Sequence, residues 1–182
     1  MPEPIRIRED LPANLGVLAY LSPAAGHAPL AEAPEDHADP YQGAGSHPDV
    51  VEHLWVRLNG ALPADCRVVV YGSPALAHPE AGVILALAMG TSYALRLQSV
   101  DRDTAMAAGA EPVHEYSAPK GHVVNAPLQL GSDWVFGRWD RREPAWCARS
   151  YAAWERPIAG PAARTAGGLN PTALIEFDPQ LG

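Results

Sequence analysis

His78 and Glu80 lie two residues apart in a turn-rich stretch that follows a predicted strand. An imidazole and a carboxylate at this spacing could divide general acid and general base catalysis between them. Such a pair also needs a third group that positions the substrate, and the sequence identifies none. His78 and Glu80 are therefore the leading catalytic candidates for a small hydrolase-like enzyme, one of three functions considered below.

Two candidate nucleophiles, Cys66 and Ser73, lie close to this loop in the sequence. A cysteine needs a nearby base or positive field to become a thiolate, and no local signature supplies one for Cys66. Ser73 follows a predicted strand, as in a nucleophile elbow, but Pro74 has no N–H to contribute to an oxyanion hole. We interpret residues 72–74 as a turn. Cys66 and Cys147 are interpreted as small buried hydrophobic side chains.

Three histidines in the front third of the chain, His37, His47 and His53, stand among carboxylates. Imidazole and carboxylate groups are good ligands for zinc and other divalent ions. His47 and His53 are six residues apart, so they point to different faces of a helix, unlike the two histidines of HExxH. They are candidate ligands without a metal-binding motif, and we expect no cofactor.

The surplus negative charge of the chain is concentrated near its front. The formal net charge is −8, eight carboxylates lie between Glu9 and Glu52, and no Lys or Arg lies between Arg8 and Arg57. Clustered carboxylates attract a basic protein surface and repel nucleic acid. We therefore expect a protein partner with a basic surface, no nucleic acid and no membrane, although a solvated acidic loop would have the same composition. The expected binding residues are Glu32, Glu35, Asp36 and Asp39.

Aromatic residues are dense between positions 134 and 154. Such density is typical of either a packed core or an interface hot spot. Trp139 and Trp154 fall at the ends or off the main faces of the predicted elements. We expect one of these two to join a binding surface.

A helix is predicted over 48–60. Ser46 can cap its N-terminus, Pro48 suits the first turn, and Asp49 suits the positive end of the helix dipole. Apolar residues then recur at helical spacing, and Asn59-Gly60 provides the end. The residues on that face are Val51, Leu54, Trp55, Leu58 and Leu62.

Strands are predicted over 67–71, 83–89 and 93–97, with 113–116 and 132–139 as further candidates. The connection between 83–89 and 93–97 is too short for a parallel crossover, so these two form an antiparallel hairpin. Segment 83–89 lacks polar alternation and should be central and covered on both faces. Helices are predicted over 101–110 and 141–154, the latter opened by a capping box ending in Glu143. Cys147, Tyr151 and Trp154 lie on one face of that helix.

The predicted fold is a single α+β domain with a three-to-five-stranded, mostly antiparallel sheet, two main helices and long irregular arms. Residues 1–46 form an N-terminal acidic arm with one possible strand, 47–156 the core domain, and 157–182 an extended C-terminal arm. The element order over 48–110 is similar to the core of restriction-endonuclease-like nucleases. That resemblance implies an acid on the second strand and a Glu-x-Lys on the third, which 83–89 and 93–97 lack. Metal nuclease activity is therefore not expected.

The longest aliphatic runs, 15–21 and 83–89, are seven residues long, whereas a membrane span needs about 20. Two cysteines without CxxC spacing favour a reduced, cytoplasmic chain, although a single bridge between them stays open. The preferred hypothesis is a non-enzymatic protein-binding module, such as an inhibitor or immunity-type protein that uses its acidic arm. The alternatives are the hydrolase-like enzyme and a homo-oligomeric structural protein, for example a homodimer joined by exchange of the C-terminal arm.

Overall fold

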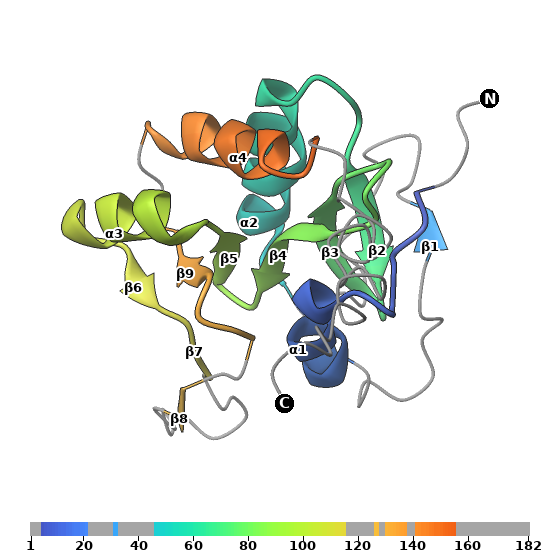
Figure 1. The fold of residues 1–182 in the computed structure, drawn as a ribbon, viewed down its shortest axis with the longest axis horizontal. Coiled ribbons are helices and arrows are strands. Elements are labelled where there is room, and N and C mark those ends of the chain that lie inside the picture. The colour runs from blue at the N-terminus through green and yellow to red at the C-terminus, as the bar shows by residue number, and fades with distance from the viewer. Residues whose placement is uncertain are drawn as a thin grey trace, which may run out of the picture.

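The computed structural model describes residues 5–21, 31–32, 46–115, 126–127, 130–137 and 141–155. Within them, seven strands form one antiparallel sheet in the order β1-β2-β3-β4-β5-β9-β6. Helices cover this sheet on both sides (Figure 1). The α+β class is therefore confirmed, and the sheet has more strands than the three to five predicted. The strands are β1 (Ala31–Glu32), β2 (Arg67–Val70), β3 (Ser73–Ala77), β4 (Ile84–Met89), β5 (Ser92–Arg96), β6 (Glu111–Pro112) and β9 (Trp134–Phe136).

The prediction of a turn at 72–74 was wrong, because Ser73 and Pro74 begin β3. The turn lies one residue earlier, where Tyr71 (φ 47°) and Gly72 (φ 78°) connect Val70 to its partner Ser73. Two consecutive positive φ angles define the tight hairpin turn whose twist matches the flanking strands. Pro74 is tolerated because pairing with β4 starts only at the next residue, Ala75.

The hairpin of β4 and β5 is confirmed, with Met89 paired to Ser92 across the turn at Gly90. Strand β4 is central, and its residues Ile84 to Ala88 are buried. On β9, Trp134 and Phe136 pack in one cluster and Val135 in the other, as the predicted alternation requires. A separate pair, β7 (His114–Glu115) and β8 (Ala126–Pro127), forms a small second sheet.

One face of the sheet is covered by two helical segments (Figure 1). The first runs continuously over 48–61 as α2 (Pro48–Glu52), the π-helix η1 (His53–Leu58) and the 3-10 turn η2 (Asn59–Ala61). The second is α4 (Glu143–Ala152). Both predicted helices are therefore confirmed in position. The first differs in its winding, which is not α-helical throughout.

The other face is covered by an unpredicted helix, α1 (Pro12–Leu21), in the segment described above as an arm (Figure 1). Val17 and Leu21 of α1 pack against the sheet. Its buried Asn14 joins two backbone segments, because Nδ2 donates to Arg8 O at 2.7 Å and to Gly82 O at 2.8 Å, and Oδ1 accepts from the Ile84 amide at 3.0 Å. Asn14 thereby adds to the backbone bond from the Arg8 amide to Gly82 O, 2.9 Å long.

Helix α3 (Ser99–Ala107) confirms the helix predicted over 101–110, shifted by two residues at its start. It follows β5, which ends at the buried Arg96. The Arg96 guanidinium donates to Ile84 O at 2.9 Å and to Asp133 at 2.6 Å, and it also bonds Ala13 O of α1. Burial lowers the pKa of Arg96, and the Asp133 carboxylate opposes that shift. Arg96 thereby ties α1 to the sheet.

Both predicted helix caps were wrong. The N-cap of α2 is His47, whose Nδ1 accepts from the Asp49 amide at 3.3 Å, and not Ser46. The N-cap of α4 is Arg142, whose side chain makes no capping bond. Glu143, predicted to complete a capping box, instead turns into the core and is fully buried.

Candidate functional site

The inner face of α4 carries four buried side chains with reactive groups. Glu143, Cys147, Ser150 and Tyr151 are all buried there, at spacings of three and four residues that place them on one face. This face packs against the helical segment 48–61 and the strands β4 and β5. We call it the α4 seam. One metal-binding candidate, His53, and one catalytic candidate, His78, contact opposite ends of this face.

At one end of the α4 seam, His53 and Glu143 form a buried pair. The distance from His53 Nε2 to Glu143 Oε2 is 3.0 Å, and the two side chains are 2% and 0% exposed. The ring of Tyr93 lies 5.1 Å from the His53 ring, centroid to centroid. A buried carboxylate or imidazole needs such a partner, because burying either group alone is costly. The pair therefore joins segment 48–61 to α4.

Sequence reasoning placed His53 among the metal candidates and Glu143 in a helix cap, and so missed their contact. Each residue lies three or four positions from buried apolar residues of its own helix, Val50 for His53 and Trp146 and Cys147 for Glu143, which was the available signal. The structure shows no group of three or more His, Cys, Asp or Glu side chains able to hold a metal ion among the residues it describes. His47 is exposed, and its side chain caps the N-terminus of α2.

At the other end of the α4 seam lies His78, which is 1% exposed. Its Nδ1 accepts from the backbone amides of Glu80 at 3.3 Å and Ala81 at 3.1 Å. Its ring stacks on Tyr151 with centroids 4.2 Å apart. Burial lowers the pKa of His78, so the ring is held neutral with Nδ1 as an acceptor. His78 thereby stabilises the turn after β3, and its contact with Glu80 is made by the Glu80 backbone amide.

The two cysteines are free thiols in the core, and neither is exposed. Burial raises the pKa of Cys66 to about 12 and that of Cys147 to about 12. Cys66 Sγ donates to Ala64 O at 3.4 Å. Thiols of this kind hold almost no thiolate at neutral pH. The burial of both cysteines fits the predicted packing role. Ser73, the other candidate nucleophile, is the first residue of β3.

The acidic arm is only partly described. Glu35, Asp36, His37, Asp39 and Trp139 lie outside the described residues. Glu32 lies in β1, which pairs with β2 at the end of the sheet order, opposite Val68. Downstream of the arm, the His47 amide donates to Gly90 O at 2.7 Å in the β4–β5 turn. Trp154 is partly buried against the core.

Arginines of the described chain are largely neutralised by nearby carboxylates. Five of them lie within ion-pair distance of an aspartate, and the shortest contacts are bidentate. Of these five aspartates, only Asp10 belongs to the acidic span from Glu9 to Glu52, which itself contains no Lys or Arg. The pairs are Arg8–Asp10, Arg67–Asp65, Arg96–Asp133, Arg102–Asp103 and Arg149–Asp101.

No helix in the described ranges is both long and apolar enough to cross a membrane. The chain matches no protein-family model, and neither the curated proteins nor the solved structures compared with it contain a significant match.

Proposed function

We propose that this protein is a non-enzymatic binding module, of the inhibitor or immunity type, whose acidic arm docks on a basic partner protein. The observation that carries the proposal is the partition of charge. The span from Glu9 to Glu52 contains eight carboxylates and no Lys or Arg. Meanwhile, five arginines of the described chain are engaged by aspartates, only one of which, Asp10, belongs to that span. The acidic surplus therefore remains for a partner.

Two contacts attach the arm to the folded core domain, which supports its proposed role as a binding surface. Strand β1 joins the arm to the sheet through Ala31 and Glu32, which pair with Val69 and Val68. At the far end of the arm, His47 bonds to Gly90. A segment fixed in this way loses less conformational entropy on binding than a free chain. We extend the proposal to a reducing, cytoplasmic setting, because both cysteines are free.

The test uses the basic protein that the full chain retains from its source extract, with polylysine as a purely electrostatic reference. The arm variant carries Glu32→Gln, Glu35→Gln, Asp36→Asn and Asp39→Asn. Its matched control, the body variant, carries Glu80→Gln, Asp103→Asn, Glu111→Gln and Glu155→Gln, four exposed carboxylates outside the arm. Both variants change the net charge by the same amount.

We expect the arm variant to bind the partner roughly tenfold more weakly, about 1.4 kcal/mol, and the body variant to bind within about twofold of the unmodified chain. Equal losses in both variants would show that only net charge matters and would refute docking through the arm. Light scattering on the same samples addresses the homo-oligomeric alternative, which requires more than one copy per particle in the absence of partner.

A further inference from the structure

The helical segment 48–61 is wound in a way that its sequence does not require. Val51, Leu54 and Leu58 recur at the spacing of an α-helix. Yet the amide of Asn59 bonds to the carbonyl of Leu54, five residues back, which is the hydrogen bond of a π-helix, and it also contacts the carbonyl of Val56, three residues back. In an α-helix the same amide would bond to Trp55. Because π turns are rare and often occur at functional positions, the winding needs a cause beyond the local sequence.

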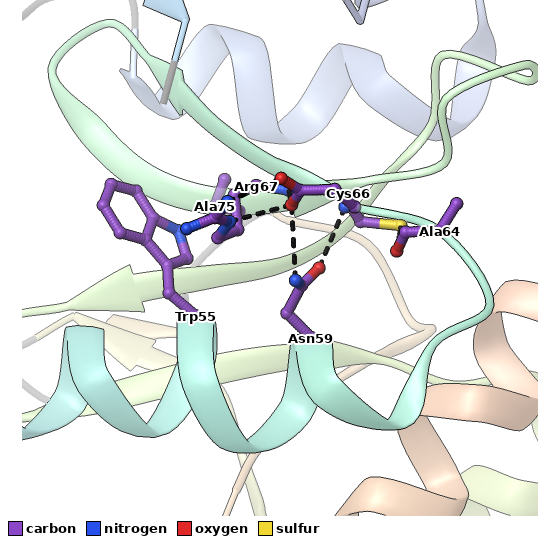
Figure 2. Close-up of polar contacts among 7 residues, drawn as sticks. Trp55, Asn59, Ala64, Cys66, Arg67 and Ala75 are labelled. Carbon is purple, nitrogen blue, oxygen red and sulfur yellow. Dashed lines mark hydrogen bonds and ion pairs between the residues drawn. The ribbon is translucent and has the colours of Figure 1, made fainter. Parts of the chain in front are cut away.

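Three side chains connect the π-helix to three other parts of the molecule. His53, its first residue, pairs with Glu143 of α4 at 3.0 Å. Trp55 Nε1 donates to Ala75 O of β3 at 3.1 Å, as seen in Figure 2. Asn59, immediately after its last residue, accepts from the Cys66 amide through Oδ1 at 2.9 Å.

Both polar atoms of the Asn59 side chain form hydrogen bonds (Figure 2). Besides the bond to Cys66, its Nδ2 donates to Asp65 at 3.3 Å. Asp65 is itself held by Arg67, whose Nε donates to it at 2.8 Å. The Arg67 guanidinium also keeps the pKa of Asp65 below its usual value, so this carboxylate stays ionised at neutral pH. The start of β2 therefore presents a rigid, complementary site to Asn59.

The contacts at the two ends of the π-helix select its register. An α-helix turns the chain by about 100° per residue, and a π-helix turns it by less. If the same residues wound as an α-helix with His53 in place, Asn59 would rotate by about one residue position, away from Cys66. If Asn59 stayed in place, His53 would rotate away from Glu143 instead. Only the π winding allows both contacts.

We propose that segment 53–61 is a two-register helix, held in its π register by the Asn59 contact to β2 and the His53 contact to α4. Release of the Asn59 contact lets the segment wind as an α-helix, and the partly exposed loop 62–64 takes up the shift. The side chain of Val56 is 51% exposed on the π-helix, so its truncation leaves the contacts of His53 and Asn59 in place. This proposal does not depend on the acidic arm.

The experiment is NMR measurement of scalar couplings across hydrogen bonds in the full chain. In the unmodified protein, the Asn59 amide should couple to the Leu54 carbonyl. In Asn59→Ala, the amide of residue 59 should couple to the Trp55 carbonyl, because the contacts to Cys66 and Asp65 are gone. The matched control Val56→Ala should retain the coupling to Leu54.

If Asn59→Ala folds poorly, the same couplings are measured in a second variant, Asn59→Ser, which shortens the same side chain. Coupling to Leu54 that persists in the Asn59 variants would overturn the proposal, since the π winding would then be a property of the local chain. Coupling to Trp55 in the unmodified protein would overturn it as well.

Discussion

At the scale of single residues, the described core uses its polar groups as connectors. Asn14, Arg96, His53 and Glu143 are each buried, and each bonds to a segment distant in sequence. Of these contacts, we expect the pair of His53 and Glu143 to cost most when one partner is removed, because the remaining polar side chain stays buried without its partner.

We predict that Glu143→Leu and His53→Leu each lower the free energy of unfolding by about 3–5 kcal/mol. The double variant should recover part of that loss, because it removes both buried polar groups at once. Urea denaturation of the four proteins completes the cycle. Strictly additive losses would mean that the two side chains do not interact.

The thiols give a prediction about reactivity. The pKa values of Cys66 and Cys147 are raised from the ordinary 9.0 to about 12. At pH 8 these thiols therefore hold about a thousandfold less thiolate than free cysteine does. We expect alkylation of the native protein to be slower than that of the urea-unfolded chain by at least this factor. Rapid labelling of either native thiol would contradict the packing role.

The same shifts predict how stability depends on alkaline pH. Because the folded chain holds the two thiol protons up to about pH 12 and the unfolded chain releases them near pH 9, the free energy of unfolding falls as pH rises through that window. Cys66→Ala/Cys147→Ala should show a shallower decline in urea titrations between about pH 8.5 and 10. An unchanged slope would contradict these shifts.

At the scale of elements, apolar periodicity and short connections located several elements correctly. The β4–β5 hairpin followed from the short, glycine-containing connection, and α4 followed from its apolar face. Strand β3 was missed because Ser-Pro is typical of a turn, whereas the turn was made by Tyr71 and Gly72. Helix α1 was missed because its sequence, PANLGVLAYL, is apolar almost all round and shows no helical face. Glu143 was missed because its spacing fits a capping box equally well.

The β2–β3 turn gives a prediction at this scale. Gly72→Ala should lower the free energy of unfolding by about 1–2 kcal/mol, because alanine is disfavoured at a φ of 78°. Gly60→Ala is the matched control, since a Cβ at that position meets no atom within 4 Å. Thermal unfolding of the two variants compares them directly, and equal effects would argue against a left-handed turn at Gly72.

At the scale of the whole molecule, charge is distributed unevenly along the chain. Four arginines of the core domain pair with aspartates of the same domain, and the surplus of carboxylates lies in the span from Glu9 to Glu52. This asymmetry could be read from the sequence. Two of the five arginine pairs could not, because Arg96–Asp133 and Arg149–Asp101 join residues 37 and 48 positions apart. The other three pairs join residues one or two positions apart.

The dependence of partner affinity on salt tests the central claim most directly. Measured by calorimetry between about 50 and 500 mM salt, the affinity of the unmodified chain should fall steeply as screening increases. The body variant should keep most of that dependence, and the arm variant, with Glu32, Glu35, Asp36 and Asp39 neutralised, should lose most of it. An arm variant as salt-sensitive as the unmodified chain would contradict docking through the acidic arm.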